Sequence, residues 1–315
     1  MPALPSVTVA IATYNRAQLL RQTLEGLVKQ DYPAERLEIL VINNNSPDRT
    51  EETVASFAAA AHPPRHVLER QQGANFARNR AIQEARGDII IFADDDILVE
   101  AGWVREMVRP FQEHPDRRMG AVGGEVIPVF PDGCPLWVAG FHGPQALRAD
   151  CGPLRPGQVP MSASLAFLRR TFAELGFFDT ALGRKGGVVF GGDENLVIKR
   201  LFKGGYEVWF APACPVLHQM PAERTTFRYV RKHAFDSARS RVVGRVRDDQ
   251  DEGRSSTGYL LSRLAGNVLK VPAFALLSAL AFIAGQGGAA RKFLVRSWRS
   301  CGYLYQIPRS LAGKI

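Results

Sequence analysis

The sequence contains little cysteine and no recognisable cysteine motif. Its 315 residues include four cysteines, none of which forms a CxxC pair or has the spacing of metal ligands. Cys134 and Cys151 could bridge a loop, but scattered thiols in a chain of this length are more typical of a reducing compartment. The opening MPALPSVTVA lacks the positively charged start of a secretory signal. We therefore expect a cytoplasmic protein.

Acidic residues are scarce in the last third of the chain. Residues 211–315 contain 17 basic and 6 acidic side chains, residues 1–210 contain 23 and 25, and the whole chain has a net charge of +9. A near-neutral body with a basic extension suggests an anionic partner, either nucleic acid or membrane headgroups. No RNP, helix-turn-helix or zinc-finger pattern accompanies the basic residues. An anionic membrane surface is therefore the expected partner, and nucleic acid is not.

Charge is missing altogether from one segment of this basic extension. The 20 residues of Val271–Ala290 are uncharged, and Lys270 and Arg291 flank them. About 20 apolar residues can span a bilayer, but the glycines, proline and glutamine of this segment make insertion marginal. A helix lying in the membrane interface is favoured, with a packed helical hairpin and a true span as alternatives. Residues 241–315 are accordingly expected to form a basic helical region of a peripheral membrane protein, at the inner face of the plasma membrane.

Apolar runs alternate with amphipathic stretches through the first 114 residues. The predicted strands are 7–12, 37–42, 66–68 and 88–93, with helices at about 15–28, 48–61 and 75–85 between them. Asn15 is expected to cap the first of these helices and Asp48 the second. The alternation predicts an open parallel α/β sheet. Beyond it follow a proline- and glycine-rich loop region (128–160), two helices (169–176 and 193–202) and a strand (207–210).

Polar residues cluster at three of the predicted strand ends. The clusters are Thr13–Arg16, Asn43–Asp48 and Asp94–Asp96. Ligands of parallel α/β sheets bind beyond the carboxyl ends of the strands, so we expect the three clusters to form one site. Adjacent carboxylates at the end of a buried strand raise one another's pKa unless a cation offsets their charge. Mg²⁺ or Mn²⁺ suits such oxygen ligands, so the acidic triplet predicts a site for a metal ion and a diphosphate.

Segments in register over about residues 5–240 resemble the family 2 glycosyltransferases with the GT-A fold. They are Val7–Arg16 (VTVAIATYNR), Ser46–Asp48, Gly73–Asn79 (GANFARN), Asp88–Asp96 (DIIIFADDD), Glu174–Asp179 (ELGFFD), Gly192–Arg200 (GDENLVIKR) and Gly205–His218 (GYEVWFAPACPVLH). The resemblance implies a Rossmann-like mixed sheet flanked by helices in residues 1–240, with a nucleotide-binding half (1–114) and an acceptor half (115–240). It also implies an inverting hexosyltransferase that moves a sugar from a nucleotide-diphosphate sugar to a hydroxyl of a saccharide or lipid-linked acceptor.

The resemblance assigns the donor-binding residues position by position. Those expected around the nucleobase and ribose are Thr13, Asn15, Arg16 and Asn43. Arg78 would approach the base or a phosphate. Asp94 would lie near the ribose, Asp95 would contact the diphosphate, and Asp96 would be the metal ligand. His218 lies where related enzymes sometimes place a further metal ligand, although a histidine that only forms structural hydrogen bonds is an equal alternative.

Asp193 aligns with the catalytic aspartate of the family. An inverting transfer needs a general base at the acceptor hydroxyl, and a carboxylate can serve as one. The alternative is a plain helix N-cap, a role that aspartate often fills. The sequence departs from the family at Asn43, where an aspartate is usual, and at Ser164, where an asparagine is frequent. The first departure leaves the nucleobase undecided, and the second bears on contacts to the acceptor or the donor sugar.

Two other functions compete with glycosyl transfer. A non-catalytic protein that binds a nucleotide sugar or carbohydrate could retain the same fold. A nucleotidyltransferase would also place acidic residues near a nucleotide, but it would need a glycine-rich triphosphate loop after the first strand. Thr13–Arg16 is not such a loop. The intact Asp94, Asp96 and Asp193 favour an enzyme over a binding protein.

Overall fold

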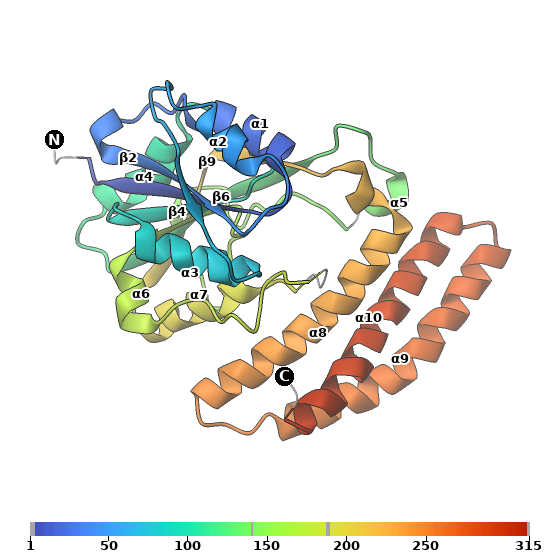
Figure 1. The fold of residues 1–315 in the computed structure, drawn as a ribbon. Coiled ribbons are helices and arrows are strands. Elements are labelled where there is room, and N and C mark those ends of the chain that lie inside the picture. The colour runs from blue at the N-terminus through green and yellow to red at the C-terminus, as the bar shows by residue number, and fades with distance from the viewer. Residues whose placement is uncertain (1–3, 140, 187–189, 314–315) are drawn as a thin grey trace. The chain divides into compact units, whose positions relative to one another are not determined.

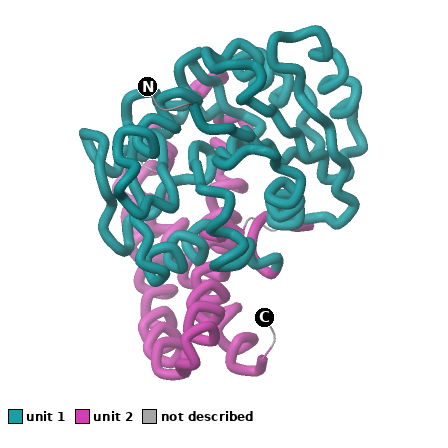
Figure 2. Tube along the Cα trace, turned by 90° about the vertical axis from the view of Figure 1, so that its left-hand side faces the viewer, with its two compact units in different colours: residues 1–129, 144–180, 194–219 teal, residues 130–143, 181–193, 220–315 magenta. Residues whose placement is uncertain are grey.

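The chain divides into two compact units in the computed structural model, which describes residues 4–139, 141–186 and 190–313. The first unit comprises residues 1–129, 144–180 and 194–219, and the second comprises residues 130–143, 181–193 and 220–315 (Figure 2). The chain therefore passes between the units several times. The domain boundary expected at residue 240 falls inside a long helix of the second unit, α8 (Phe227–Asp251).

The first unit is built on a mixed sheet. Within the described residues the sheet has nine strands in the order β3-β2-β1-β4-β8-β6-β9-β5, with β7 paired to β9 (Figure 1). The strands are β1 (Val7–Thr13), β2 (Leu37–Asn43), β3 (Arg65–Leu68), β4 (Ile89–Ala93), β5 (Ile97–Leu98), β6 (Met119–Val129), β7 (Gly152–Pro153), β8 (Ser164–Leu168) and β9 (Glu207–Gln219). β3, β2, β1 and β4 are parallel, and β8 is antiparallel to β4. The parallel half predicted from the first 93 residues is confirmed.

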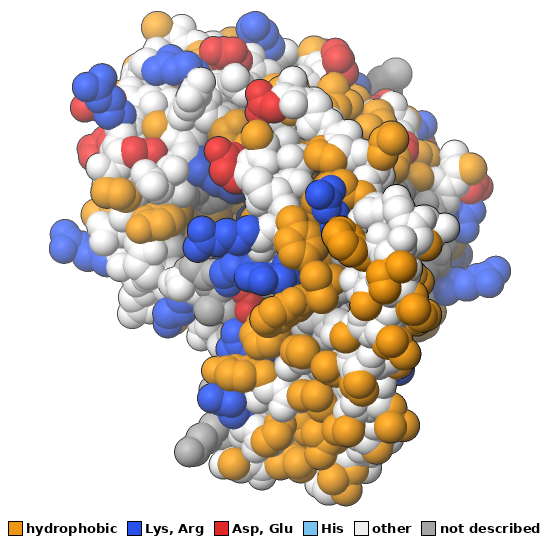
Figure 3. Space-filling model, turned by 90° about the vertical axis from the view of Figure 1, so that its right-hand side faces the viewer, with side chains coloured by type: hydrophobic (Ala, Val, Ile, Leu, Met, Phe, Trp, Pro, Cys, Tyr) orange, Lys and Arg blue, Asp and Glu red, His pale blue; other side chains and the backbone are white. Residues whose placement is uncertain are grey.

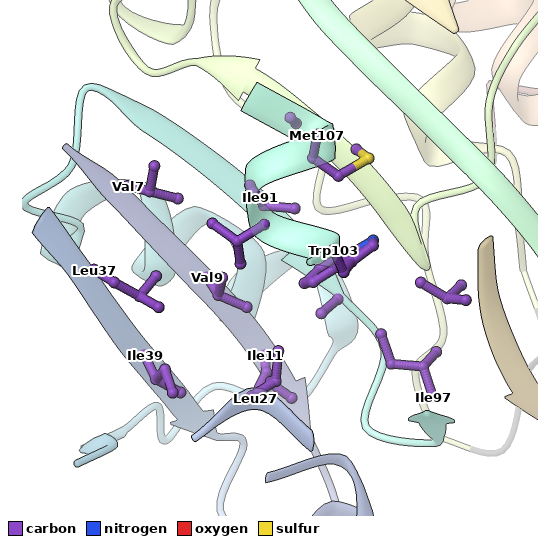
Figure 4. Close-up of a cluster of buried hydrophobic side chains, with 14 of the residues drawn as sticks. Val7, Val9, Ile11, Leu27, Leu37, Ile39, Ile91, Ile97, Trp103 and Met107 are labelled. Atoms are coloured by element: carbon purple, nitrogen blue, oxygen red, sulfur yellow. The ribbon is translucent and has the colours of Figure 1, made fainter. Parts of the chain in front are cut away.

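Helices of the first unit cover both faces of this sheet. They are α1 (Ala17–Leu27), α2 (Thr50–Ala55), α3 (Ala74–Glu84), α4 (Trp103–Glu113), α6 (Arg170–Leu175) and α7 (Asp193–Lys203), whose first residue is grouped with the second unit. Side chains alternate along a strand, so Val9, Ile11 and Ile91 pack on one face with Trp103 and Met107 of α4 (Figure 4). The strand residues that alternate with these point to the other face of the sheet, where they pack with α3, α6 and α7.

The start of α1 differs from the sequence prediction. Asn15 does not cap this helix; it adopts a left-handed backbone conformation (φ 54°), which asparagine tolerates better than most residues. The carboxylate of Asp48 accepts the hydrogen bond from the Ala17 N–H instead, at 2.8 Å, and its other oxygen accepts from the Thr50 N–H at the start of α2. One side chain from the loop after β2 therefore fixes the beginning of two helices.

The acceptor half contains longer strands than the sequence pattern indicated. The strand expected at 207–210 continues to Gln219 as β9, although Pro212 and Pro215 lie inside it. Proline cannot donate a ladder hydrogen bond, and the pairing with β6 shifts register here: Ala211 pairs with Gly124, and the next paired residue of β9 is Val216, which pairs with Val126. The prolines thus lie where the ladder is interrupted. Beyond them, β9 resumes and carries His218.

In the described part of the second unit there are three long helices, so the helical C-terminal extension is confirmed. They are α8 (Phe227–Asp251), α9 (Thr257–Ile283) and α10 (Gly287–Leu311); the unit also contains the short helix α5 (Leu136–Ala139). α10 packs against both α8 and α9. At Gly302 the backbones of α10 and α8 approach so closely that a β-carbon would collide with the carbonyl oxygen of Phe235. Ala238, Val242 and Ile307 are fully buried in this packing.

Candidate functional site

The loops that follow β1, β2 and β4 meet at one edge of the sheet, as their sequence positions predicted. Thr13 pairs in register with Asn43, and the Asn44 N–H donates to the Thr13 carbonyl at 2.9 Å. On the side of β4, the Thr13 hydroxyl donates to Asp95 Oδ2 at 2.8 Å. Three strand ends are therefore connected directly by hydrogen bonds.

The acidic triplet turns from β4 into the short strand β5, which pairs with the end of β9. Ile97 of β5 lies opposite His218, and the Gln219 N–H donates to the Asp96 carbonyl at 2.8 Å. This pairing brings His218 Nε2 to 2.9 Å from Asp96 Oδ1 and 3.9 Å from Asp94 Oδ2. One ligand atom from each of Asp94, Asp96 and His218 lies within 4.8 Å of the other two. The extension of β9 is thus what places the histidine beside the carboxylates.

The donor set of this cluster fits a divalent metal ion. Two carboxylates supply the oxygen ligands that Mg²⁺ and Mn²⁺ prefer, and an imidazole adds a nitrogen ligand that transition metals accept readily. Asp96 is fully buried and His218 is 7% exposed, so both side chains are held in place by the surrounding strands. Buried carboxylates are costly without a compensating positive charge.

Arg16 supplies part of that positive charge. Its Nη1 atom lies 2.8 Å from Asp95 Oδ1 and 2.9 Å from Asp96 Oδ2. Burial alone would lower the pKa of Arg16, but the negative charges of Asp95 and Asp96 raise it above its ordinary value. Burial raises the pKa of Asp95, and the charge of Asp96 raises it further against the opposing effect of Arg16. The carboxylates outnumber this guanidinium, so a bound cation would relieve their repulsion.

The loop after β2 is held by two adjacent asparagines. Asn43, which was expected near the nucleobase, is buried; its Oδ1 accepts from the Ser46 N–H at 2.8 Å and its Nδ2 lies 3.2 Å from His66 Nε2. Asn44 was not singled out from the sequence. Its amide donates to two backbone carbonyls, one of them Gln71, and accepts from the Gly73 N–H. It therefore fixes the segment leading into α3, and the only sequence signal for it was the asparagine run after a strand.

The GANFARN motif on α3 joins another motif of the sequence. Asn75 Nδ2 donates to the Asp179 carbonyl at 2.8 Å, and the side chain of Asn79 exchanges two hydrogen bonds with the backbone of Phe178. Arg78 lies between them on the helix, where it donates to Asn75 Oδ1 and to the Ser162 hydroxyl. The two asparagines thus anchor the ELGFFD segment, and Arg78 is held at the same surface of α3.

Ser164 and Asp193, two further residues of the family pattern, are both buried but lie in different parts of the fold. Ser164 is fully buried; its hydroxyl accepts from the indole N–H of Trp103 and contacts the sulfur of Met107, so it packs α4 against the sheet. Asp193 is 4% exposed and is the first residue of α7. It is grouped with the second unit, whereas the donor-site residues described above belong to the first. Its role as general base stays a prediction.

A protein-family model matches the part of the chain that contains this edge of the sheet. Residues 8–124 match the family model described as "Glycosyl transferase family 2". The matched segment runs from β1 into β6 and contains the loops after β1, β2 and β4 together with α3. It therefore includes the predicted donor-binding residues and the acidic triplet, while His218 and Asp193 lie outside it.

Relatives at the sequence level are glycosyltransferases. A glucosyl-dolichyl phosphate glucuronosyltransferase of Haloferax volcanii is 25% identical over 248 residues, which are 75% of this chain and 76% of that protein. The glycosyltransferase AglE of the same organism is 33% identical over 131 residues, 41% of this chain and 42% of AglE. A probable glycosyltransferase of Bacillus subtilis, YdaM, is 35% identical over 129 residues, 40% of this chain and 30% of YdaM. Against AglE and YdaM, the match thus covers less than half the length of the relative.

Solved structures share the fold over nearly the whole chain. The mannosyltransferase PcManGT of Pyrobaculum calidifontis, in complex with GDP-Man and Mn²⁺, has a TM-score of 0.63 and 21% identity, covering 100% of this chain and 89% of the other. The structure of residues 1–349 of Staphylococcus aureus TarS with UDP-GlcNAc has a TM-score of 0.53 and 14% identity, covering 98% and 92%. These similarities confirm the GT-A architecture.

Proposed function

We propose that this chain is a family 2 glycosyltransferase with the GT-A fold and that it catalyses the following reaction. The enzyme moves a sugar, with inversion, from a nucleotide-diphosphate sugar to a hydroxyl group of a saccharide or lipid-linked acceptor. The observation that carries the proposal is the cluster of Asp94, Asp96 and His218 at the carboxyl edge of the sheet. Its carboxylate and imidazole ligands lie beside the loops that family 2 enzymes use for the nucleotide.

The same cluster is the proposed metal centre. Asp94, Asp96 and His218 would hold the ion, and we favour Mn²⁺ over Mg²⁺ because an imidazole nitrogen suits a transition metal better. Solved neighbours named as complexes with Mn²⁺ support this choice. A metal ion bound there would offset the negative charge of the diphosphate leaving group.

The protein's own side chains would bind and orient the nucleotide. Thr13, Asn15, Arg16 and Asn43 would surround the base and ribose, and Arg78 would approach the base or a phosphate. Asp95 is held by Thr13 and Arg16 at 2.8 Å each. Through these bonds it would keep the loop after β1 in position beside the diphosphate. The amide of Asn43 already engages Ser46 and His66, so its contribution to base recognition would come from shaping the loop.

Asp193 is the proposed general base. An inverting transfer displaces the nucleoside diphosphate from the face opposite the incoming hydroxyl, so the base must act on the acceptor and not on the donor. A carboxylate at the start of α7 can accept the hydroxyl proton as the new glycosidic bond forms. The alignment of GDENLVIKR with the family pattern supports this assignment.

The acceptor and the location of the reaction form a further part of the proposal. One relative is named for a glucosyl-dolichyl phosphate substrate, and the last third of this chain is strongly basic. Both features support a lipid-linked acceptor presented at an anionic membrane surface. The enzyme would then act on the cytoplasmic side, where nucleotide sugars are made.

Donor turnover tests the transferase against a protein that only binds carbohydrate. The full chain is incubated with a panel of nucleotide sugars and Mn²⁺, and release of nucleoside diphosphate is measured with and without acceptor lipids. We expect release from at least one donor, dependence on the metal and stimulation by an acceptor. Tight donor binding without any release under these conditions would identify a binding protein and reject the transferase.

A further inference from the structure

Helix α9 is unusual because little of the described chain covers it. Of its 27 residues only Leu260, Asn267 and Ala281 are buried. Within the described residues it is the one helix long and apolar enough to cross a membrane by length and composition, and 11% of its most apolar window is buried. An apolar helix of a soluble protein normally faces a core, so this exposure calls for a partner.

Four of the exposed apolar residues of α9 form a stripe. Leu269, Leu276, Leu280 and Ile283 follow one another at intervals of seven, four and three residues, which places them on one helical face. They are 73%, 62%, 53% and 81% exposed, respectively. The buried Asn267 and Ala281 lie on the opposite side, toward α10. Figure 3 shows hydrophobic side chains gathered over the side of the molecule where α9 lies.

Charge around the stripe has one sign. Residues 253–315 contain nine basic residues and no acidic residue. Lys270 lies on α9, and Arg291 and Lys292 lie in the first two turns of α10. Aliphatic side chains bordered by cations complement a leaflet with anionic headgroups. A protein partner would more often meet aromatic residues and mixed charge at the centre of the surface.

The packing of α9 against α10 opposes a membrane span. The Ser278 hydroxyl donates to the Ala290 carbonyl and the Ser297 hydroxyl donates to the Val271 carbonyl, so the two helices run antiparallel. Arg291 and Arg296 therefore lie at the level of the uncharged part of α9 and would enter the hydrocarbon with it, at high cost.

The uncharged helical stretch is also short. The helix ends at Ile283 and α10 begins at Gly287, so the uncharged run Val271–Ala290 is not one continuous helix. The uncharged helical part, Val271–Ile283, is about 20 Å long at 1.5 Å per residue, and the further length of α9 that a span of about 30 Å would need includes Lys270. The charges of the hairpin therefore oppose a span, but its stripe can enter one leaflet.

We propose that α9 lies along the surface of an anionic bilayer, with its stripe in contact with the acyl chains and Lys270, Arg291 and Lys292 among the headgroups. The occupant of this surface is the lipid leaflet itself. The inference rests on the membrane attachment included in the proposed function and is independent of the transfer chemistry. It assigns the attachment to one face of one helix.

Vesicle binding tests the stripe. The full chain is titrated with vesicles of equimolar phosphatidylcholine and phosphatidylglycerol and with vesicles of phosphatidylcholine alone. We expect binding to the anionic vesicles, weakening in high salt, and little binding to the neutral ones. The double variant Leu276→Glu/Leu280→Glu should bind the anionic vesicles at least ~10-fold more weakly, since each leucine contributes apolar burial. Both positions are exposed, so the helix should keep its packing.

A control variant introduces a glutamate at an exposed leucine outside α9. Leu68→Glu replaces a leucine of β3 that is 41% exposed, and it should bind vesicles like the parent. Thermal unfolding of each variant checks that the fold is retained. A double variant that binds as tightly as the parent overturns the assignment to α9, and a parent that binds neither kind of vesicle overturns attachment altogether. Donor turnover, measured without lipid, reports separately on the proposed function.

Two further outcomes separate the leaflet from other partners. Protein that stays with vesicles after alkaline carbonate treatment would be spanning, which overturns the proposal. A parent that dimerises in lipid-free sedimentation, and loses the dimer but no vesicle binding in the double variant, would show that a second copy covers the stripe. As a positive readout, Ile283→Trp should gain fluorescence that lipids brominated near the headgroup quench more strongly than lipids brominated at mid-bilayer.

Discussion

The first unit holds its polar side chains in place by hydrogen bonds, whereas the second unit leaves a wide apolar face without cover. In the first, Asp48, Asn44 and Asp95 each bond to backbone or to a side chain of another loop. In the second, α9 exposes six aliphatic side chains by more than half. In the proposed function, the first unit would bind a ligand that needs fixed geometry. The second would present a surface suited to a fluid partner.

This difference predicts how each unit responds to amino-acid substitutions. A metal ion and a diphosphate are recognised by groups held to within tenths of an ångström, so single substitutions there should have large effects on one step. A lipid surface is recognised by area and charge, which are spread over many residues. Substitutions in the long helices α8, α9 and α10 should therefore act gradually on attachment or on stability and leave the donor site unaffected.

Removing the metal ion should have the largest effect. We expect EDTA to abolish donor binding and turnover, and Mn²⁺ to restore both. Asp96→Asn removes one carboxylate ligand. Because the loss of supporting groups around a metal already costs 10–100-fold in affinity, this variant should lose at least ~100-fold in Mn²⁺ affinity, measured by calorimetry.

The exposed Asp31 offers the control for that variant, because it is 70% exposed on its side chain and pairs with Arg105 away from the acidic triplet. Asp31→Asn should keep the metal affinity and turnover of the parent. Full turnover of the parent in EDTA would show that Asp94, Asp96 and His218 do not form a required metal centre.

Asp193→Asn should have the second largest effect, on turnover alone. Asparagine keeps the size of the side chain and caps a helix about as well as aspartate, so stability and donor affinity should stay close to those of the parent. Turnover should fall by ~10²–10⁴-fold, the range for loss of a general base. Steady-state kinetics together with donor titration separate the two quantities.

Asp96→Asn provides the contrast to Asp193→Asn, because it should weaken donor binding itself. If Asp193→Asn turns over like the parent, or loses activity only because its unfolding temperature collapses, Asp193 is a structural cap and another group is the base.

The sequence predicted the edge of the sheet well because its signals are local. Buried strands such as Val7–Thr13 are continuous apolar runs, and the polar residues that follow them mark their ends. Local sequence patterns did not predict features that depend on contacts between residues distant in sequence. Asp48 caps α1 from 31 residues away in sequence and displaces Asn15 from that role.

The same limit explains the other differences. The prolines of β9 hid a strand that continues after a shift in register, and it is this continuation that brings His218 to Asp96. The departure from the family pattern at Ser164 gave no information on side-chain direction; in the structure the Ser164 hydroxyl accepts from the indole N–H of Trp103. Charge and hydropathy predicted the helices of the second unit, but the exposure of α9 depends on how α10 packs.

Gly302→Ala should lower the stability of the second unit without touching the donor site. A β-carbon at this position would collide with the backbone of α8 at Phe235, and overpacking of this kind costs about 1–3 kcal/mol. Gly244→Ala is the control on α8, because a β-carbon there meets nothing within 4 Å. It should stabilise the helix by roughly 0.5–1 kcal/mol. Urea denaturation measures both, and equal effects at the two positions would contradict the close packing of α8 and α10.

The smallest expected effect is a pH dependence confined to the second unit. Burial, together with the nearby charges of Arg184, His142, Arg224 and Arg299, lowers the pKa of His233 to about 4. In the unfolded chain a histidine titrates near pH 6.5. Between these values the unfolded state binds the proton and the folded state does not, so folding stability is retained above about pH 6.5 and falls as the pH drops toward 4. From pH 7 to 5.5 the loss of folding stability should be about 1 kcal/mol.

The variant His233→Gln tests this dependence. It carries no titrating group at this position, so its unfolding free energy should fall less over this interval. Identical pH slopes for the parent and His233→Gln in urea denaturation would show that His233 is not the group that titrates.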